Sequence, residues 1–300
     1  MINNVREHLQ DKVKYRMWLF SDLQQSVPEQ AEYCLSTAVD DFKSLDLTCD
    51  YIWYLGDAVE GNNQEQLRKM TEIQLNLLKP LNIPVRFVLG NHDFDYIWDN
   101  RDSSEQLPVF FHEAVANTEG WKTIDQLTSF YFSEDIGDYK VIFLSDHGDP
   151  AGEWISTHGL VHGNEQKYPY TKDDLLALRQ EIAQSSKKVI TVSHGAFAGG
   201  NRAFPLWDPL LPLPETVKVH FYGHSHIGDV VQGKEKVYRK IAYVDHEKTP
   251  QINVSSLENR RGDEVRSVIL EIYQDATMGI YFRDHEKKIW ADLYMIDDKR

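Results

Sequence analysis

Five short segments of this sequence end an apolar run in side chains that can bind a divalent metal ion. Carboxylate and imidazole groups bind hard and borderline divalent metals, and a neutral amide oxygen can complete the coordination shell. One such segment is commonly a turn, and one histidine is more often structural than a ligand. Five of them in one chain predict a metal site. The segments are Asp22-Leu23-Gln24, Gly56-Asp57, Gly90-Asn91-His92-Asp93, Ser193-His194-Gly195 and Gly223-His224-Ser225-His226.

The elements around the first three segments alternate between strand and helix. Apolar residues recur at helical spacing from Ala31 to Leu45 and from Leu67 to Leu77, which predicts a helix in each interval. Asp22, Asp57 and Asn91 lie 35 and 34 positions apart, a spacing that fits one strand–helix–strand unit. In such sheets ligands bind beyond the carboxyl ends of the strands. The three strands are expected at 15–21, 51–57 and 85–89.

The second half of the chain is less regular, and we expect it to belong to the same single domain, 1–300. A hairpin turning across Ile136–Tyr139 should be followed by a loop-rich insert at about 147–170 and by a helix at about 171–184. Residues from about 228 to 300 are expected to form a C-terminal strand extension. Within this extension, a hairpin at 266–284 should complete the second sheet of the fold.

Composition limits the partners of this protein. The 300 residues are 41% hydrophobic, which indicates a folded globular chain, and the formal net charge is −15. Nucleic-acid polymers and anionic membranes are disfavoured because both require a basic surface, whereas a small anionic substrate is compatible. Cys34 and Cys49 form no metal or disulfide motif, and the polar N-terminus resembles no secretion signal. A cytoplasmic protein is therefore expected.

In their order and spacing, the motifs resemble those of the calcineurin-like metallophosphoesterase superfamily. The resemblance spans residues 15–226 and consists of D-x-[H/Q], GD-x-V-x-x-G (GDAVEG, 56–61), GNHD (90–93), SHG (193–195) and GH-x-H (GHSH, 223–226). It implies an α/β fold: a four-layer αββα sandwich of two mixed sheets flanked by helices. It also implies two divalent metal ions at the strand ends.

The resemblance assigns ligands position by position. The first metal ion would be held by Asp22, Gln24, Asp57 and His226, and the second by Asp57, Asn91, His194 and His224, with Asp57 bridging the two.

The same resemblance implies hydrolysis by a hydroxide shared between the two ions, which attacks a phosphoryl group in line. His92 would face the phosphoryl group and either stabilise its charge or protonate the departing oxygen, while Asp93 would orient His92. Asn91 and His92 would contact the substrate. Arg202 could reach a phosphate or a base, although an ordinary surface arginine is the slightly favoured interpretation.

Gln24 departs from the commonest form of the family, which has histidine at this position. A glutamine supplies an oxygen in place of an imidazole, so the first ion should be bound more weakly and the site should shift toward harder ions such as Mn²⁺. Two divalent ions are expected, with Mn²⁺ favoured and Fe, Zn²⁺ or Mg²⁺ left open. Glutamine at this position also resembles the Mn²⁺-dependent ADP-ribose/CDP-alcohol diphosphatases. Alternatively, Gln24 does not bind metal and a water molecule takes its place.

Three functions remain open on the sequence. The first is hydrolysis of a phosphodiester or diphosphate in a small, nucleotide-like molecule. The second is a phosphomonoesterase or protein phosphatase; the protein-phosphatase branch usually carries GD-x-V-D-R-G and GNHE, where this chain has GDAVEG and GNHD. The third is a non-catalytic metal-binding scaffold, which is disfavoured because His92 and seven candidate ligands are all present.

Overall fold

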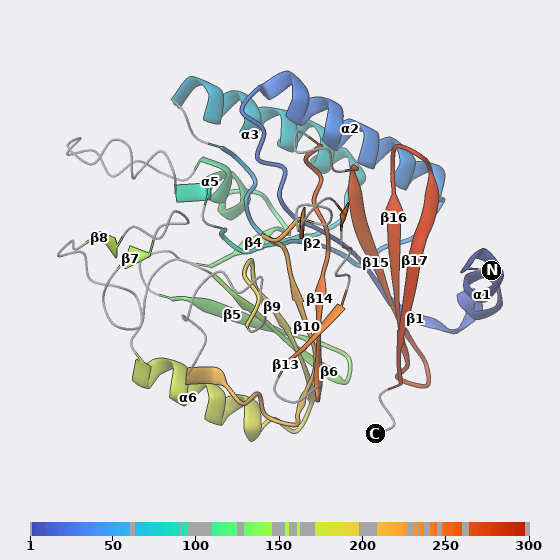
Figure 1. Cartoon of the computed structure of the whole chain (residues 1–300), viewed down its shortest axis with the longest axis vertical. Coiled ribbons are helices and arrows are strands. Elements are labelled where there is room, and N and C mark those ends of the chain that lie inside the picture. Colours follow the sequence, from blue (N-terminus) through green and yellow to red (C-terminus); the bar gives the residue numbers. More distant parts are fainter. Residues whose placement is uncertain are drawn as a thin grey trace.

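Two β-sheets pack against each other and are enclosed by helices in the computed structural model of this chain (Figure 1). Helices α2 and α3 cover one sheet at the top of the view, and α6 covers the other at the bottom. The residues that the structure describes are 2–60, 64–90, 92–94, 110–124, 129–145, 154–155, 161–162, 172–197, 209–226, 231–232, 235–236, 241–244, 248–259 and 264–297.

The first sheet has seven strands in the order β17-β16-β15-β1-β2-β3-β4. Strands β1 to β4 run parallel, and β15, β16 and β17 extend the sheet from β1 in antiparallel fashion. The strands are β1 (Val13–Phe20), β2 (Tyr51–Tyr54), β3 (Val85–Phe87), β4 (Lys122–Thr123), β15 (Arg266–Tyr273), β16 (Met278–Asp284) and β17 (Ile289–Ile296).

The second sheet has six strands in the order β13-β14-β10-β9-β6-β5. Its four central strands, β14, β10, β9 and β6, are parallel. The strands are β5 (Tyr131–Ile136), β6 (Tyr139–Leu144), β9 (Lys188–Val192), β10 (Val217–Tyr222), β13 (Ile241–Val244) and β14 (Thr249–Asn253). Short strand pairs are formed by β7 (Trp154–Ile155) with β8 (Val161–His162), and by β11 (Val231–Gln232) with β12 (Glu235–Lys236).

The helices bury their apolar faces on the outer surfaces of the two sheets. Apolar residues of α2, α3 and α5 form one core cluster with the first sheet, and those of α6 form another with the second sheet. Among the described residues, no helix is long and apolar enough to cross a membrane. The helices are α1 (Ile2–Leu9), α2 (Pro28–Ser44), α3 (Gln64–Leu78), α5 (Phe110–Ala116) and α6 (Lys172–Ala183), with single 3-10 turns at Gln10–Lys12, Lys79–Leu81 and His92–Phe94.

The last four residues of strand β1 (17–20) are all apolar because both faces of the sheet are covered there. Successive side chains of a strand point to opposite faces of the sheet, so Trp18 and Phe20 pack under the helices while Met17 and Leu19 face the second sheet. All four side chains have no exposed surface. A strand that is covered on both faces cannot alternate with polar residues. The expected four-layer architecture is therefore confirmed.

The terminal hairpin forms where it was expected but joins the other sheet. Strands β15 and β16 pair around the turn at 274–277, but β15 lies beside β1 in the first sheet, with Met17 opposite Leu270. The prediction that this hairpin completes the second sheet is wrong. The hairpin covers the open edge of β1, while β13 and β14, also in the C-terminal segment, extend the second sheet instead.

Most of the predicted loop-rich insert at 147–170 lies outside the described residues.

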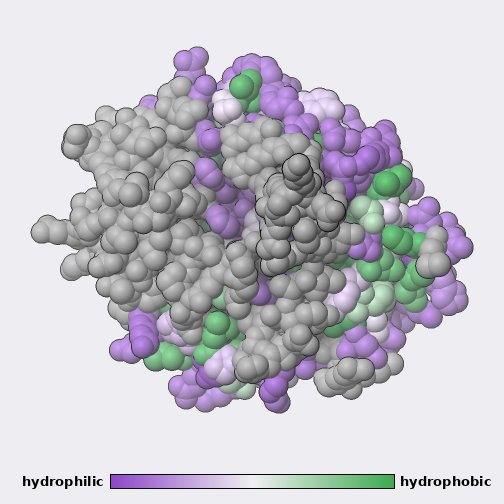
Figure 2. Space-filling model, viewed as in Figure 1, coloured by the Kyte–Doolittle hydropathy of each residue, from purple (hydrophilic) through white to green (hydrophobic). Residues whose placement is uncertain are grey.

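The surface that is described carries mainly hydrophilic residues on the face shown in Figure 2, with hydrophobic ones scattered among them. The large exposed hydrophobic side chains of the described residues come from distant parts of the sequence: Val27, Tyr33, Leu176, Ile289 and Met295.

A buried polar network ties helix α2 to the C-terminal strands. The Asp41 carboxylate accepts hydrogen bonds from Nε and Nη2 of Arg283 and from Nδ1 of His285, each at 2.8 Å. The other ring nitrogen of His285 lies 2.7 Å from the Ser267 hydroxyl, which accepts a hydrogen bond from the Trp18 indole at 2.8 Å. Burial would raise the pKa of Asp41, but Arg283 and His285 outweigh it and lower that pKa to about 2.

We predict that Asp41→Ala lowers the free energy of unfolding by about 3–5 kcal/mol at pH 7, because it leaves the Arg283 guanidinium buried without its carboxylate. The folded-state pKa of Asp41 is depressed. Its contribution is therefore complete above pH about 4 and is lost as the pH falls toward the folded value. Urea unfolding of both proteins across this range should show their difference shrinking.

The neighbouring Asp40→Ala is the control, because Asp40 is exposed and its loss should change stability by no more than about 0.5 kcal/mol. Equal destabilisation by the two variants would show that the network does not hold α2.

Candidate metal centre

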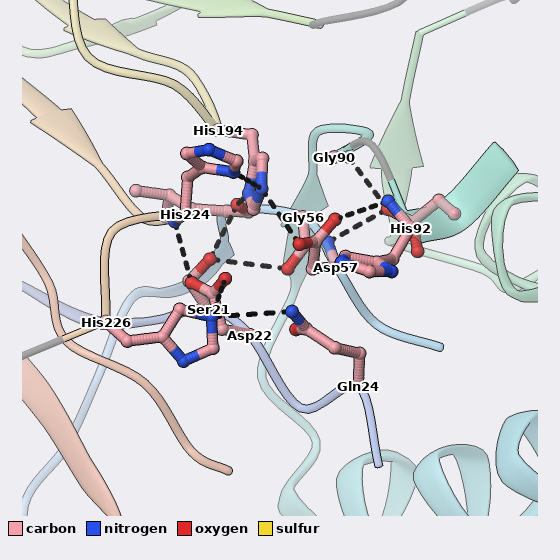
Figure 3. Close-up of polar contacts among 12 residues, drawn as sticks. Ser21, Asp22, Gln24, Gly56, Asp57, Gly90, His92, His194, His224 and His226 are labelled. Atoms are coloured by element: carbon pink, nitrogen blue, oxygen red, sulfur yellow. Dashed lines mark hydrogen bonds and ion pairs between the residues drawn. The ribbon is translucent and has the colours of Figure 1, made fainter. Parts of the chain in front are cut away.

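The carboxyl ends of the parallel strands of both sheets meet at one place, and polar side chains gather there. They lie in the loops after β1, β2, β3, β9 and β10, and Figure 3 shows them arranged around Asp22 and Asp57. Segments from both sheets therefore contribute to one cluster. Its described members are Asp22, Gln24, Asp57, His92, His194, His224 and His226.

One group of this cluster consists of Asp57, His194 and His224. The Nε2 atom of His194 lies 3.1 Å from Oδ2 of Asp57 and 3.2 Å from Nδ1 of His224. One ligand-type atom from each of the three residues lies within 4.8 Å of the others. The Nδ1 atom of His194 contacts the Leu55 carbonyl oxygen at 2.6 Å, so Nδ1 carries a proton and Nε2 is the nitrogen directed into the cluster.

A second group lies beside it and consists of Asp22, Gln24 and His226. The Nε2 atom of His226 lies 3.1 Å from Oδ1 of Asp22 and 3.4 Å from the amide nitrogen of Gln24. The amide oxygen of Gln24 is buried and has no hydrogen-bond partner among the described residues. Rotating the terminal amide by half a turn exchanges its two atoms and points this oxygen toward His226.

Backbone amides hold one oxygen of each carboxylate. The His224 amide donates to Oδ2 of Asp22 at 2.9 Å, and the His92 amide donates to Oδ1 of Asp57 at 2.8 Å. The other oxygen of each carboxylate is the one that faces an imidazole nitrogen. Each carboxylate is therefore fixed in orientation and presents a single oxygen to the cluster.

These contacts fit a pair of divalent metal ions. Two ligand atoms bound to one ion at about 2.1 Å and at right angles to each other lie about 3 Å apart. The imidazole–carboxylate separations of 3.1 Å in both groups match this value. The buried Gln24 oxygen without a partner is a further donor of the type that hard cations prefer.

Four residues of the cluster adopt backbone conformations with positive φ, which residues other than glycine rarely adopt. Asp22, Asp57, His224 and His226 have φ values of 58°, 52°, 62° and 39°. Each such residue costs about 1–3 kcal/mol and is retained where the surrounding structure imposes it, most often at functional sites. Gly56, with φ 85°, could not carry a side chain, because a Cβ atom would lie 2.8 Å from Nδ1 of His194.

The family model for calcineurin-like phosphoesterases matches residues 15–228, which include every member of this cluster. This chain belongs to the calcineurin-like phosphoesterase family. It is therefore a hydrolase that acts on phosphate esters, and the family implies a dinuclear centre of divalent metal ions. None of the curated proteins matches the chain at a significant level.

Two solved structures support the fold of this phosphoesterase. A dimetal phosphatase from Danio rerio has a TM-score of 0.63 at 12% identity, with 95% of this chain and 99% of that chain covered. The purple acid phosphatase PPD1 from yellow lupin (Lupinus luteus) seeds has a TM-score of 0.55 at 13% identity, with 94% of this chain and 53% of that chain covered.

The electrostatics of the phosphoesterase site favour bound cations. Burial would raise the pKa of Asp57, but the nearby His194 and His92 outweigh it and lower this pKa. The pKa of Asp22 is likewise lowered, because His226 outweighs burial. Both carboxylates are therefore ionised in a site with almost no solvent contact, where an opposite charge is required.

Asp93 holds the loops together. Its carboxylate accepts hydrogen bonds from the backbone amides of Asp57 at 3.0 Å, Ala58 at 2.9 Å and Gly90 at 2.8 Å. Burial and the neighbouring Asp57 charge raise its pKa to about 7. Asp93 thereby links the loop after β2 to the loop after β3. That Asp93 also orients the His92 ring stays a prediction.

Two predicted site residues lie outside the described residues, namely Asn91 and Arg202. Glu258 was missed by sequence reasoning, although it is fully buried and its Oε1 lies 3.0 Å from Nδ1 of His226. It follows β14, another parallel strand of the second sheet. The rule that ligands lie beyond the carboxyl ends of strands would have indicated it, had the strand been recognised.

Gln24→His tests whether this position binds metal in the phosphoesterase. An imidazole is a softer ligand than an amide oxygen, so the affinity for Zn²⁺ relative to Mn²⁺ should rise about tenfold, or 1.4 kcal/mol. Competitive metal titration of the purified protein measures this ratio.

The control is Gln25→His at the adjacent buried glutamine, whose amide contacts Cys34 Sγ at 3.6 Å. An unchanged metal preference in Gln24→His, or the same change in both variants, would remove Gln24 from the ligand set.

Proposed function

We propose that this protein is a dinuclear-metal phosphohydrolase that cleaves a phosphodiester or diphosphate bond in a small, nucleotide-like molecule. One observation carries the proposal: two buried carboxylates, three histidines and an amide oxygen from both sheets converge with His92 beside them. Such a donor set is the type that holds two metal ions, and His92 adds a titratable group next to it.

The proposed roles follow the two groups of the cluster. Asp22, Gln24 and His226 would hold the first ion, and His194 and His224, with the predicted ligand Asn91, would hold the second. Asp57 would serve both. When bound, the two ions supply the positive charge that activates a water molecule for attack and neutralises the phosphoryl oxygens. The backbone amides and Asp93 keep the carboxylates in place, so that no reorganisation is needed during turnover.

His92 is proposed to act on the substrate itself. Its backbone amide is anchored to Asp57, and Figure 3 shows its imidazole ring next to that carboxylate at the edge of the cluster. His92 is partly exposed, whereas His194 is fully buried. A partly exposed imidazole beside the site can approach a bound phosphoryl group and donate a proton to the departing oxygen.

The net charge of the chain supports a small substrate, and the type of metal ligands supports manganese. A net charge of −15 disfavours binding of long nucleic acids, whereas local cations can attract a small anion. The oxygen of Gln24 makes the first group richer in hard donors and favours Mn²⁺. The Danio rerio structure is described as a dimetal phosphatase, which agrees with a two-ion site.

A substrate screen tests the proposal. In Mn²⁺, the protein should hydrolyse bis-p-nitrophenyl phosphate and a nucleotide diphosphate such as ADP-ribose faster than p-nitrophenyl phosphate, and chelation should abolish all turnover. Turnover of the monoester alone would favour a phosphomonoesterase. A protein that binds Mn²⁺ and cleaves none of the three would be a metal-binding scaffold, and the proposal would be rejected.

His92→Ala should lower kcat by about 10²–10⁴-fold without changing Mn²⁺ content, because the residue acts on the substrate and not on the metal. The loss should be smaller for p-nitrophenyl esters, whose leaving group needs little protonation, than for an alkyl ester. Steady-state kinetics and metal analysis measure the two effects.

His8→Ala, at an exposed histidine of α1, is the control and should retain the parent kcat. A kcat of His92→Ala within twofold of the parent would place His92 outside the reaction.

A further inference from the structure

Glu258 is a buried carboxylate at the edge of the candidate metal centre, and the resemblance to the family did not indicate it. It lies in the loop after β14, has no exposed surface, and places Oε1 3.0 Å from Nδ1 of His226. Its backbone amide donates to the Asp22 carbonyl oxygen at 2.9 Å. Glu258 therefore contacts two of the residues proposed to hold the first ion, one through its side chain and one through its backbone.

The loop that carries Glu258 is fixed to both sheets. The Val254 amide donates to the Tyr222 carbonyl oxygen of β10 at 2.8 Å, and the Leu257 amide donates to the Ser21 carbonyl oxygen after β1 at 3.0 Å. Ser256 donates its hydroxyl proton to the Glu258 carbonyl oxygen at 3.0 Å. These contacts hold the Glu258 backbone between the two sheets, so its carboxylate is in place before any ligand binds.

Both ring nitrogens of His226 face a carboxylate: Nδ1 faces Glu258 at 3.0 Å, and Nε2 faces Asp22 at 3.1 Å. Without a bound ion both nitrogens can donate a hydrogen bond; an ion held by Asp22 would replace the proton on Nε2, while Glu258 retains the proton on Nδ1. Nε2 is thus the nitrogen available to a metal ion. A histidine that binds metal in this way commonly has a carboxylate or a carbonyl oxygen on its other nitrogen.

The two groups of the centre differ in this respect. The corresponding contact of His194 is to a neutral acceptor, the Leu55 carbonyl oxygen, at 2.6 Å. A charged acceptor increases the electron density on the metal-binding nitrogen more than a neutral one does. The charged acceptor occurs in the group that contains Gln24, which supplies an uncharged and weaker ligand.

We infer that Glu258 is a positioning residue of the first metal site, which orients His226, strengthens its Nε2 as a ligand and offsets the weak ligand Gln24. This inference rests on the proposed two-ion site. Glu258 adds negative charge to the first group without occupying a coordination position.

The test is Mn²⁺ binding to the metal-free 300-residue chain carrying Glu258→Gln, measured by titration calorimetry and electron paramagnetic resonance. Glutamine keeps the shape and a hydrogen-bond acceptor but removes the charge. The weaker of the two dissociation steps should weaken about 10–100-fold, while the other changes less than about threefold. Resonance spectra at intermediate Mn²⁺ should show isolated ions in the variant where the parent shows a coupled pair.

Glu271→Gln is the matched control, because Glu271 is equally buried in the first sheet and pairs with Arg6 and Arg16 away from the centre. Both Mn²⁺ dissociation constants of this variant should equal those of the parent. Glu258→Ala provides a second variant at the site, and thermal unfolding of each protein establishes that it is folded before titration.

The outcomes separate the inference from the proposed function. If Glu258→Gln binds both ions as the parent does, or if both steps weaken equally, the positioning role is wrong while the two-ion site stands. If the parent protein itself binds no divalent ion, the proposed function fails first.

Discussion

The compensation of two buried carboxylates is the constraint on which the rest of this site depends. Asp22 and Asp57 are almost completely buried, and each raises the energy of the other's charge. Burying an ionised carboxylate is costly unless a cation or several hydrogen bonds compensate it. Backbone amides and histidines supply part of this compensation, and the donor atoms left over point to a common space where divalent ions would supply the remainder.

Rigid loops make this arrangement possible. The short loops of the site are held in place by several features. Asp57 and His224 have positive φ values, Gly56 leaves no room for a side chain, and Asp93 binds three backbone amides. The strain in these loops is outweighed by the two sheets, whose inner faces share one apolar core. A site held in this way needs little movement to bind metal ions, so its selectivity depends on donor chemistry, which is where Gln24 and Glu258 differ from a set of histidines alone.

The C-terminal strands stabilise the elements that carry the site. Strand β15 covers the edge of β1, which ends two residues before Asp22, and the network of Asp41, Arg283 and His285 holds helix α2 over the same sheet. The carboxyl end of β1 is thereby supported on both sides. The matched family segment stops at residue 228, so β15, Arg283 and His285 come from a part of the chain that the family model does not cover.

Sequence alone indicated the strand–helix order of the first half and the ligand-type side chains at the strand ends, because each motif is local: an apolar strand, a turn and a ligand-type side chain within a few residues. The four-layer fold and the assignment of the candidate ligands came from the resemblance of these motifs to the family. Only the tertiary structure decided that β15 pairs with β1, that Asp41 meets Arg283, and that Glu258 reaches His226. Asp41 and Arg283 are 242 positions apart. Such pairings depend on which sheet edge remains open and on how the loops are held once the sheets have packed. A local pattern of residues does not predict either of these.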